Sequence, residues 1–232
     1  MIVGYQLSYP EESIRILPPG QCEEITEEGL YTCLIRNPHW QPERLTHGRA
    51  DTCFLRDASE IEEKLRRTPM TKEEVREVSI CKLHLTQNAV VYDIGSGTGS
   101  VAIEIAGVPG GVQVYAIERK PEAVELLRKN RAHFHMDNIQ IIEAPAPEGL
   151  EELPVPTHAF IGGSGGRLLD VLQTLYRKNP HMRIVINAIS METIAELKEV
   201  LDTFPMEEEE ILQMQVSRVK KLLSYHLPQA EN

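Results

Sequence analysis

The sequence predicts an α/β fold in which helices cover a doubly wound, mainly parallel sheet. Three observations predict it. Strand-like and helix-like segments alternate between residues 89 and 201. A glycine-rich turn, residues 95–99, separates an apolar run from a helical pattern. Finally, 232 residues of which 41% are hydrophobic can supply the core of one such domain and a smaller appendage.

The first 48 residues do not have the pattern of a self-sufficient domain. Leu30–Ile35 is the one strand that they indicate, and Asn37-Pro38 closes it. Because one strand cannot bury a core, we expect this part to depend on other structure.

From residue 71 the predicted elements follow in regular order. A helix opens at Thr71 with the capping box Thr71-x-x-Glu74. Ligands of doubly wound sheets bind outside the carboxyl ends of the strands, so residues 95–99, 118, 143–148 and 162–166 should converge on one cleft. The further elements, strands and helices in chain order, are Ala89–Tyr92, Val101–Ala106, Val112–Ile117, Glu122–His133, Ile139–Ile142, His158–Ile161, Leu168–Lys178, Ile184–Asn187 and Glu192–Leu201.

Charge and hydropathy exclude several classes of function. A net charge of −11 argues against general affinity for nucleic acid, which needs a basic face. No apolar run approaches the ~20 residues that span a bilayer, and the first residues lack a signal sequence, so no membrane association and a cytoplasmic location are expected. The four cysteines form no C-x-x-C pair, so we expect reduced thiols and no bound metal.

The glycine turn indicates a cofactor that contains a nucleoside. The run Asp93-Ile94-Gly95-Ser96-Gly97-Thr98-Gly99-Ser100 follows a strand and precedes a helix, where amide groups can face a ligand. A dinucleotide fingerprint needs G-x-G-x-x-G/A, but the sixth position here is Ser100. Asp93 could accept a hydrogen bond from an amino group, a need that NAD does not have and that the methionine half of S-adenosylmethionine (SAM) does have. Glu118, at the end of the next strand, suits the two ribose hydroxyls.

This arrangement of Asp93, three alternate glycines and Glu118 resembles the class I SAM-dependent methyltransferases, which have a Rossmann-like fold. The resemblance implies SAM as the cofactor. Two alternatives stay open on the motif alone: a plain strand-to-helix connection without a ligand, and a nucleotide-dependent oxidoreductase.

Three further stretches resemble one family more specifically. They are Arg67–Arg76 before the first strand of the sheet, Glu143-Ala144-Pro145-Ala146-Pro147-Glu148 after the third, and Phe160-Ile161-Gly162-Gly163-Ser164-Gly165-Gly166 after the fourth. Over residues 48–232 they look like the decarboxylating precorrin-6Y methyltransferases of cobalamin biosynthesis. That resemblance implies methylation of carbon 15 of a corrin precursor and loss of the ring C acetate carboxylate.

The resemblance also implies the residues of the site. SAM contacts would come from Thr71, Gly95, Ser96, Gly97, Thr98, Gly99, Glu118 and Ala146, with Asp93 at the amino group. Small residues at the end of the fourth strand would leave room for a flat macrocycle, and these are Gly162, Gly163, Ser164, Gly165 and Gly166. Pro145 departs from the acidic residue that this family often has near the adenine.

Both ends of the chain carry expectations about domains. Residues 1–48 resemble an incomplete remnant of an upstream tetrapyrrole methylase domain, which methylates carbon 5, plus a linker. Residues 49–232 are expected to be the SAM-dependent domain without its last strand. The resemblance further implies a homo-oligomer, with a tetramer as the candidate state.

No catalytic side chain is assigned, because methyl transfer from a sulfonium depends chiefly on positioning. Residues 49–82 hold eight basic and eight acidic residues in an otherwise acidic chain, so they could attract an anionic substrate. Within them we consider Arg56, Arg67, Lys72 and Arg76 as candidates for holding substrate carboxylates. A solvated helix face explains the same charges, and two other functions stay open: a SAM methyltransferase for another small molecule, and an inert fragment.

Overall fold

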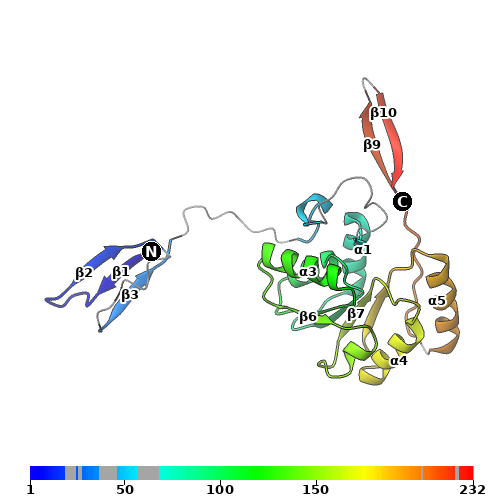
Figure 1. Ribbon diagram of the computed structural model, residues 1–232, viewed down its shortest axis with the longest axis horizontal. Coiled ribbons are helices and arrows are strands. Elements are labelled where there is room, and N and C mark those ends of the chain that lie inside the picture. The colour runs from blue at the N-terminus through cyan, green and yellow to red at the C-terminus, as the bar shows by residue number, and fades with distance from the viewer. Residues whose placement is uncertain are drawn as a thin grey trace. The chain divides into compact units, whose positions relative to one another are not determined.

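The structure is a computed structural model that describes residues 1–18, 25, 28–36, 46–56, 68–204, 206–222 and 225–231 (Figure 1). Its contacts divide the chain into two compact units, Met1–Arg44 and Leu45–Asn232.

The first unit contains a small antiparallel sheet. Its strands are β1 (Ile2–Tyr5), β2 (Ser13–Ile16) and β3 (Tyr31–Leu34), in the order β2-β1-β3. The expectation of a single strand is therefore wrong, because each strand has only four residues and gives little periodic signal. Val3 is buried, whereas Ile14, Ile16 and Leu34 are exposed, so this sheet encloses almost no core of its own.

The second unit is built on a five-stranded parallel sheet in the order β6-β5-β4-β7-β8. Its strands are β4 (Val90–Ile94), β5 (Gln113–Glu118), β6 (Ile139–Glu143), β7 (His158–Ile161) and β8 (Arg183–Ile186). Because β5 and β7 lie on opposite sides of β4, the direction of winding reverses at β4. This is the switch point at which doubly wound sheets bind ligands.

Helices cover both faces of this sheet (Figure 1). One core forms against α1, α2 and α3, and a second against α4 and α5. The helices run over α1 (Glu73–Leu83), α2 (Ser100–Ala106), α3 (Pro121–His133), α4 (Leu168–Lys178) and α5 (Met191–Thr203). The predicted α/β class is confirmed, and from β4 onward the predicted elements agree with the observed ones to within two residues.

The start of α1 differs from its prediction. The helix begins at Glu73 with Lys72 at the N-cap, and no side chain caps it. Thr71 does not form the predicted capping box. Its carbonyl instead accepts a hydrogen bond from Arg76 Nη1 at 2.7 Å.

After α5, the strands β9 (Val216–Leu222) and β10 (Tyr225–Glu231) pair with each other in a separate antiparallel sheet. The expectation that a last strand is missing from the main sheet is not tested by this pairing. Within the described ranges, no helix is long and apolar enough to cross a membrane.

Candidate functional site

The first glycine turn, Gly95–Gly99, connects β4 to α2, and its residues from Ser96 to Gly99 are buried. Its three glycines have φ angles of +74°, +56° and +79°, a region that disfavours side chains. A Cβ on Gly95 would lie 2.5 Å from the carbonyl oxygen of Gly163, and one on Gly97 would lie 2.8 Å from that of Pro69. Glycine is therefore required here for both conformation and space.

Asp93, near the end of β4, contacts this turn through Ser96. Its side chain is fully buried, and Oδ2 accepts a hydrogen bond from the Ser96 hydroxyl at 2.6 Å. Burial raises the pKa of Asp93 to about 7, although the Ser96 hydroxyl and the Ala102 amide favour the ionised form. Oδ1 is buried without a hydrogen-bond partner among the described residues, and it is the atom that could accept from a ligand.

Glu118, at the end of β5, joins that strand to the glycine turn. Oε2 accepts from the Gly97 amide at 3.0 Å, and Oε1 accepts from the amides of Arg119 and Lys120, both at 2.9 Å. The side chain is held in place by three backbone donors. Because a carboxylate offers about four lone-pair positions, Oε2 retains one for a further donor such as a hydroxyl.

The second glycine turn, Gly162–Gly166, connects β7 to α4 and meets the first turn backbone to backbone at Gly95 and Gly163. Its surroundings are open: Gly163, Gly165 and Gly166 are exposed, and a Cβ on Gly163 would meet nothing within 4 Å. The sheet therefore brings both predicted glycine clusters to one edge.

A strap of residues 46–56 fastens the start of this unit to α1, α2 and α3. Glu104 of α2 is fully buried and accepts from the Arg49 amide at 2.6 Å and from Arg49 Nη1 at 2.9 Å. Asn130 of α3 donates to the carbonyls of Leu55 and Thr98, so it links the strap directly to the first glycine turn.

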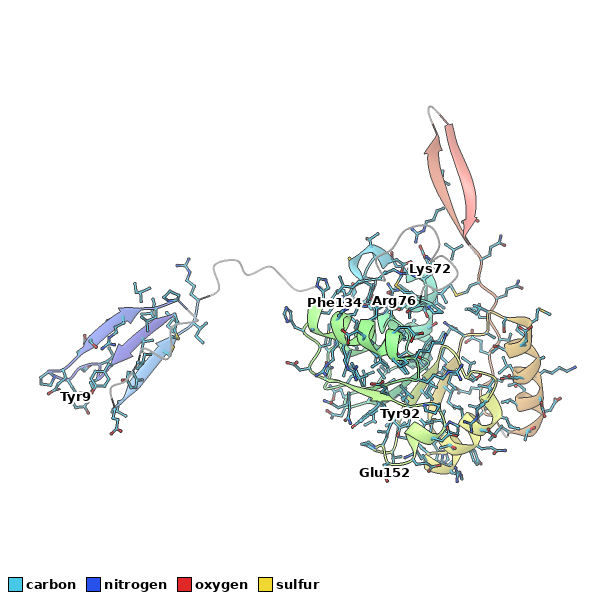
Figure 2. All side chains as sticks on the ribbon, viewed as in Figure 1. Tyr9, Lys72, Arg76, Tyr92, Phe134 and Glu152 are labelled. Atoms are coloured by element: carbon cyan, nitrogen blue, oxygen red, sulfur yellow. The ribbon has the colours of Figure 1, made fainter. Side chains whose placement is uncertain are left out.

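Arg76 is the centre of this strap's charge network, in contrast to its predicted role. Its side chain is fully buried, Nη1 lies 3.1 Å from Asp51 Oδ1, and Nε lies 3.5 Å from Glu104 Oε1. Arg76 also donates to the carbonyl of Arg49. Figure 2 shows Arg76 and Lys72 near one another at the start of α1. Arg76 is thus a structural residue and cannot reach a substrate in solvent.

The other proposed carboxylate ligands are also engaged in the structure or lie outside it. Lys72 Nζ lies 3.4 Å from Asp51 Oδ2, and Arg56 donates to the Thr68 carbonyl at 3.3 Å. Arg67 lies outside the described residues. The expectation that this segment offers free cations therefore has little support from the side chains that are described.

Thr71 and Ala146 lie at two other edges of the candidate site. Thr71 is held by Arg76, in the segment whose Pro69 carbonyl faces Gly97. Ala146 is half-buried after β6 and packs against the second core. Neither position has a side-chain contact that assigns it a ligand.

Sequence reasoning missed two features: the strap and Arg119. Arg119 directly follows Glu118, and a Cβ on Gly165 would lie 3.3 Å from its guanidinium group. Its place next to a predicted ribose carboxylate was the signal that could have identified it. A hollow of about 470 Å³, lined by Gln113, Asn138 and Ile139 among others, lies at the amino ends of β5 and β6, away from this edge.

A family model described as the precorrin methyltransferase domain matches residues 66–230. The chain belongs to this family. It is 41% identical over 133 residues to a protein of Sulfurisphaera tokodaii named probable cobalt-precorrin-6B C(15)-methyltransferase (decarboxylating), covering 56% of this chain and 69% of that one. A protein of Salmonella typhimurium named cobalt-precorrin-6B C(15)-methyltransferase (decarboxylating) is 39% identical over 127 residues. The match covers 54% of this chain and 65% of that one.

A solved precorrin-6Y C5,15-methyltransferase from Geobacter metallireducens has a TM-score of 0.70 and 32% identity. The match covers 82% of this chain and 95% of that one. The sheet and its helices are the class I SAM-dependent methyltransferase fold, which solved SAM-dependent methyltransferases share. The recognised family and the predicted fold class are both confirmed.

Proposed function

We propose that this chain binds SAM and transfers its methyl group to carbon 15 of a precorrin or cobalt-precorrin intermediate, with loss of carbon dioxide from the ring C acetate. The observation that carries the proposal is the meeting of two glycine turns, one enclosed and one open, at the carboxyl ends of β4 and β7 in a precorrin methyltransferase domain. The names of the relatives support the substrate class.

The residues at the first turn fit SAM. Glu118 has an acceptor position left for a ribose hydroxyl, and Asp93 Oδ1 lacks a partner that an ammonium group could supply. Gly97 and Gly99 leave the backbone free of side chains beside these carboxylates. When bound, SAM supplies an electrophilic methyl group. The residues of this chain hold and orient it, and such positioning can lower the activation barrier by about 7–11 kcal/mol.

The second turn fits a broad, flat substrate. No Cβ stands at Gly162, Gly163, Gly165 or Gly166, and Gly163 faces open space next to the first turn. A macrocycle could approach the methyl donor over Gly163 without meeting a side chain. The ring itself can delocalise the electrons left by decarboxylation, so no protein nucleophile is needed.

We extend the proposal to the rest of the chain. Residues 1–48 would be the remnant of an upstream domain plus a linker, and the exposure of Ile14, Ile16 and Leu34 supports a missing partner surface. Residues 49–232 would be the methyltransferase domain. Resemblance to the family supports a cytoplasmic homo-oligomer, such as a tetramer, which does not act on nucleic acid.

The test is turnover of cobalt-precorrin-6B with SAM, followed by mass spectrometry of the corrinoid. We expect a product that has gained CH2 and lost CO2. A product that has only gained CH2 would contradict the decarboxylation, and methyl label on protein or RNA instead would contradict the substrate class. Calorimetric titration with SAM and NAD checks the cofactor, because NAD binding in place of SAM would contradict the proposal at its first step.

A further inference from the structure

The second glycine turn lies between a cation and an anion. On one side a Cβ placed on Gly165 would be 3.3 Å from Cζ, Nη1 and Nη2 of Arg119. On the other side, the Ser164 hydroxyl donates to Glu196 Oε2 at 3.4 Å, and a Cβ on Gly166 would be 3.6 Å from Glu196 Oε1. The open surface between them is therefore electrically asymmetric.

The three equal distances determine how Arg119 lies. If Gly165 lay in the guanidinium plane, beyond the two Nη atoms, its Cβ position would be farther from Cζ than from either Nη atom. The distances to Cζ, Nη1 and Nη2 are equal instead, so Gly165 lies against the face of the group. The N–H donors lie around the edge of that plane. Contact with Gly165 therefore leaves the edge of the guanidinium free.

Among the described residues, the Arg119 guanidinium has no competing partner. Its side chain is exposed, and across the described parts of the chain it makes no ion pair or hydrogen bond with another side chain. Arg167, near the same turn, instead pairs with Glu148 at 2.6 Å and with Asp170 at 3.2 Å. In a chain of net charge −11, an unpaired guanidinium at this edge is a distinct feature.

We propose that Arg119 binds a carboxylate of the substrate and so fixes the orientation of the macrocycle over Gly162–Gly166. A planar guanidinium edge matches a carboxylate with two parallel hydrogen bonds. Glu196 repels carboxylates from the opposite side, so the acidic side chains of the substrate turn toward β5. This inference rests on the proposed function, and it replaces the earlier expectation that Arg76 holds those carboxylates.

The experiment uses a stable corrinoid that carries the same kind of groups, cobyrinic acid with seven free carboxylates, and its heptamethyl ester. The absorbance of the corrin reports binding to the wild type, Arg119→Gln and Arg119→Lys. Arg177→Gln is the matched control, because Arg177 is an exposed arginine of α4 that pairs with Glu151. Calorimetry measures the SAM affinity of each protein.

We expect Arg119→Gln to raise the Kd of the acid about tenfold or more, the effect of losing hydrogen bonds between charged groups. Arg119→Lys keeps the charge but loses the planar edge, so its Kd should lie between those of the wild type and Arg119→Gln. The ester should bind all four proteins equally, and SAM should too.

Three results would overturn the assignment: an unchanged Kd of the acid in Arg119→Gln, an equal loss for the ester, or a parallel loss of SAM affinity. The last would assign Arg119 to the cofactor. If the wild type itself binds neither the acid nor SAM, the proposed function fails, and the Arg119 assignment fails with it.

Discussion

The two glycine turns have similar sequences but opposite environments. In Gly95–Gly99 the residues from Ser96 to Gly99 are buried, and every Cβ that could be added would strike a neighbour. In Gly162–Gly166 most residues are exposed, and Gly163 faces open space. Glycine in the first turn lets packed backbones approach. In the second turn Gly165 and Gly166 provide positive φ angles of +63° and +81°, and Gly163 leaves the space above it open. A glycine-rich sequence alone does not distinguish these two uses.

The largest loss in the free energy of unfolding is expected from a substitution in the charge network of the strap that supports the first turn. Arg76→Met would remove the fully buried cation of this network and the donor to the Thr71 and Arg49 carbonyls, although Glu104 keeps Arg49 and Asp51 keeps Lys72. Breaking a buried ion pair costs about 3–5 kcal/mol. Urea unfolding measures this loss. The control is Arg167→Met, which removes exposed ion pairs near the second turn and should cost less than about 1 kcal/mol. Equal losses of stability in Arg76→Met and Arg167→Met would contradict the claim that the first turn is supported by buried charges and the second is surrounded by exposed ones.

Asp93 should make stability depend on pH. Its pKa is about 7 in the folded chain, well above the ordinary aspartate value of 3.8, so the unfolded chain loses this proton first as the pH rises. Stability should therefore fall between pH 4 and 7, by up to about 4 kcal/mol, and then level off. The difference between the wild type and Asp93→Asn in urea unfolding at several pH values isolates the effect. A difference that does not change with pH would show that Asp93 ionises normally.

A methyl group added to each turn tests the comparison directly. Gly95→Ala combines a positive φ with a 2.5 Å approach to the Gly163 carbonyl and should lower the free energy of unfolding by about 2–4 kcal/mol. Gly163→Ala meets no neighbour and should change it by less than about 0.5 kcal/mol. Unfolding curves that shift equally would mean that both turns are packed alike.

Glu118→Ala should weaken SAM binding by about 1.5–3 kcal/mol, since it removes an acceptor for the ribose and the partner of the Gly97 amide. Calorimetry gives the affinity. A 2′,3′-dideoxy analogue of SAM serves as the control and should bind both proteins with nearly the same, reduced affinity. If it binds the wild type as tightly as SAM does, Glu118 does not hold the ribose.

The sequence predicts this region best where its signals are local. Alternating strands and helices, Gly95–Gly99 and Glu118 all follow from patterns within a few residues of one another, and the sheet brings them together as expected. The strap could not be predicted, because Arg49 and Glu104 meet across 55 positions. For Arg76, a buried arginine and an exposed one on a helix have the same sequence pattern. Contacts between distant segments decide which is which.

The most direct test of the account combines SAM affinity with methyl transfer in Gly163→Leu. This glycine has an ordinary backbone conformation and open space around it, so leucine should fold without strain and project over the second turn. We expect a SAM Kd within about twofold of the wild type, because no cofactor contact is removed, together with loss of methyl transfer to cobalt-precorrin-6B. Full methyl transfer in this variant, or a loss of SAM affinity as large as the loss of turnover, would contradict the assignment of one turn to the cofactor and the other to the substrate.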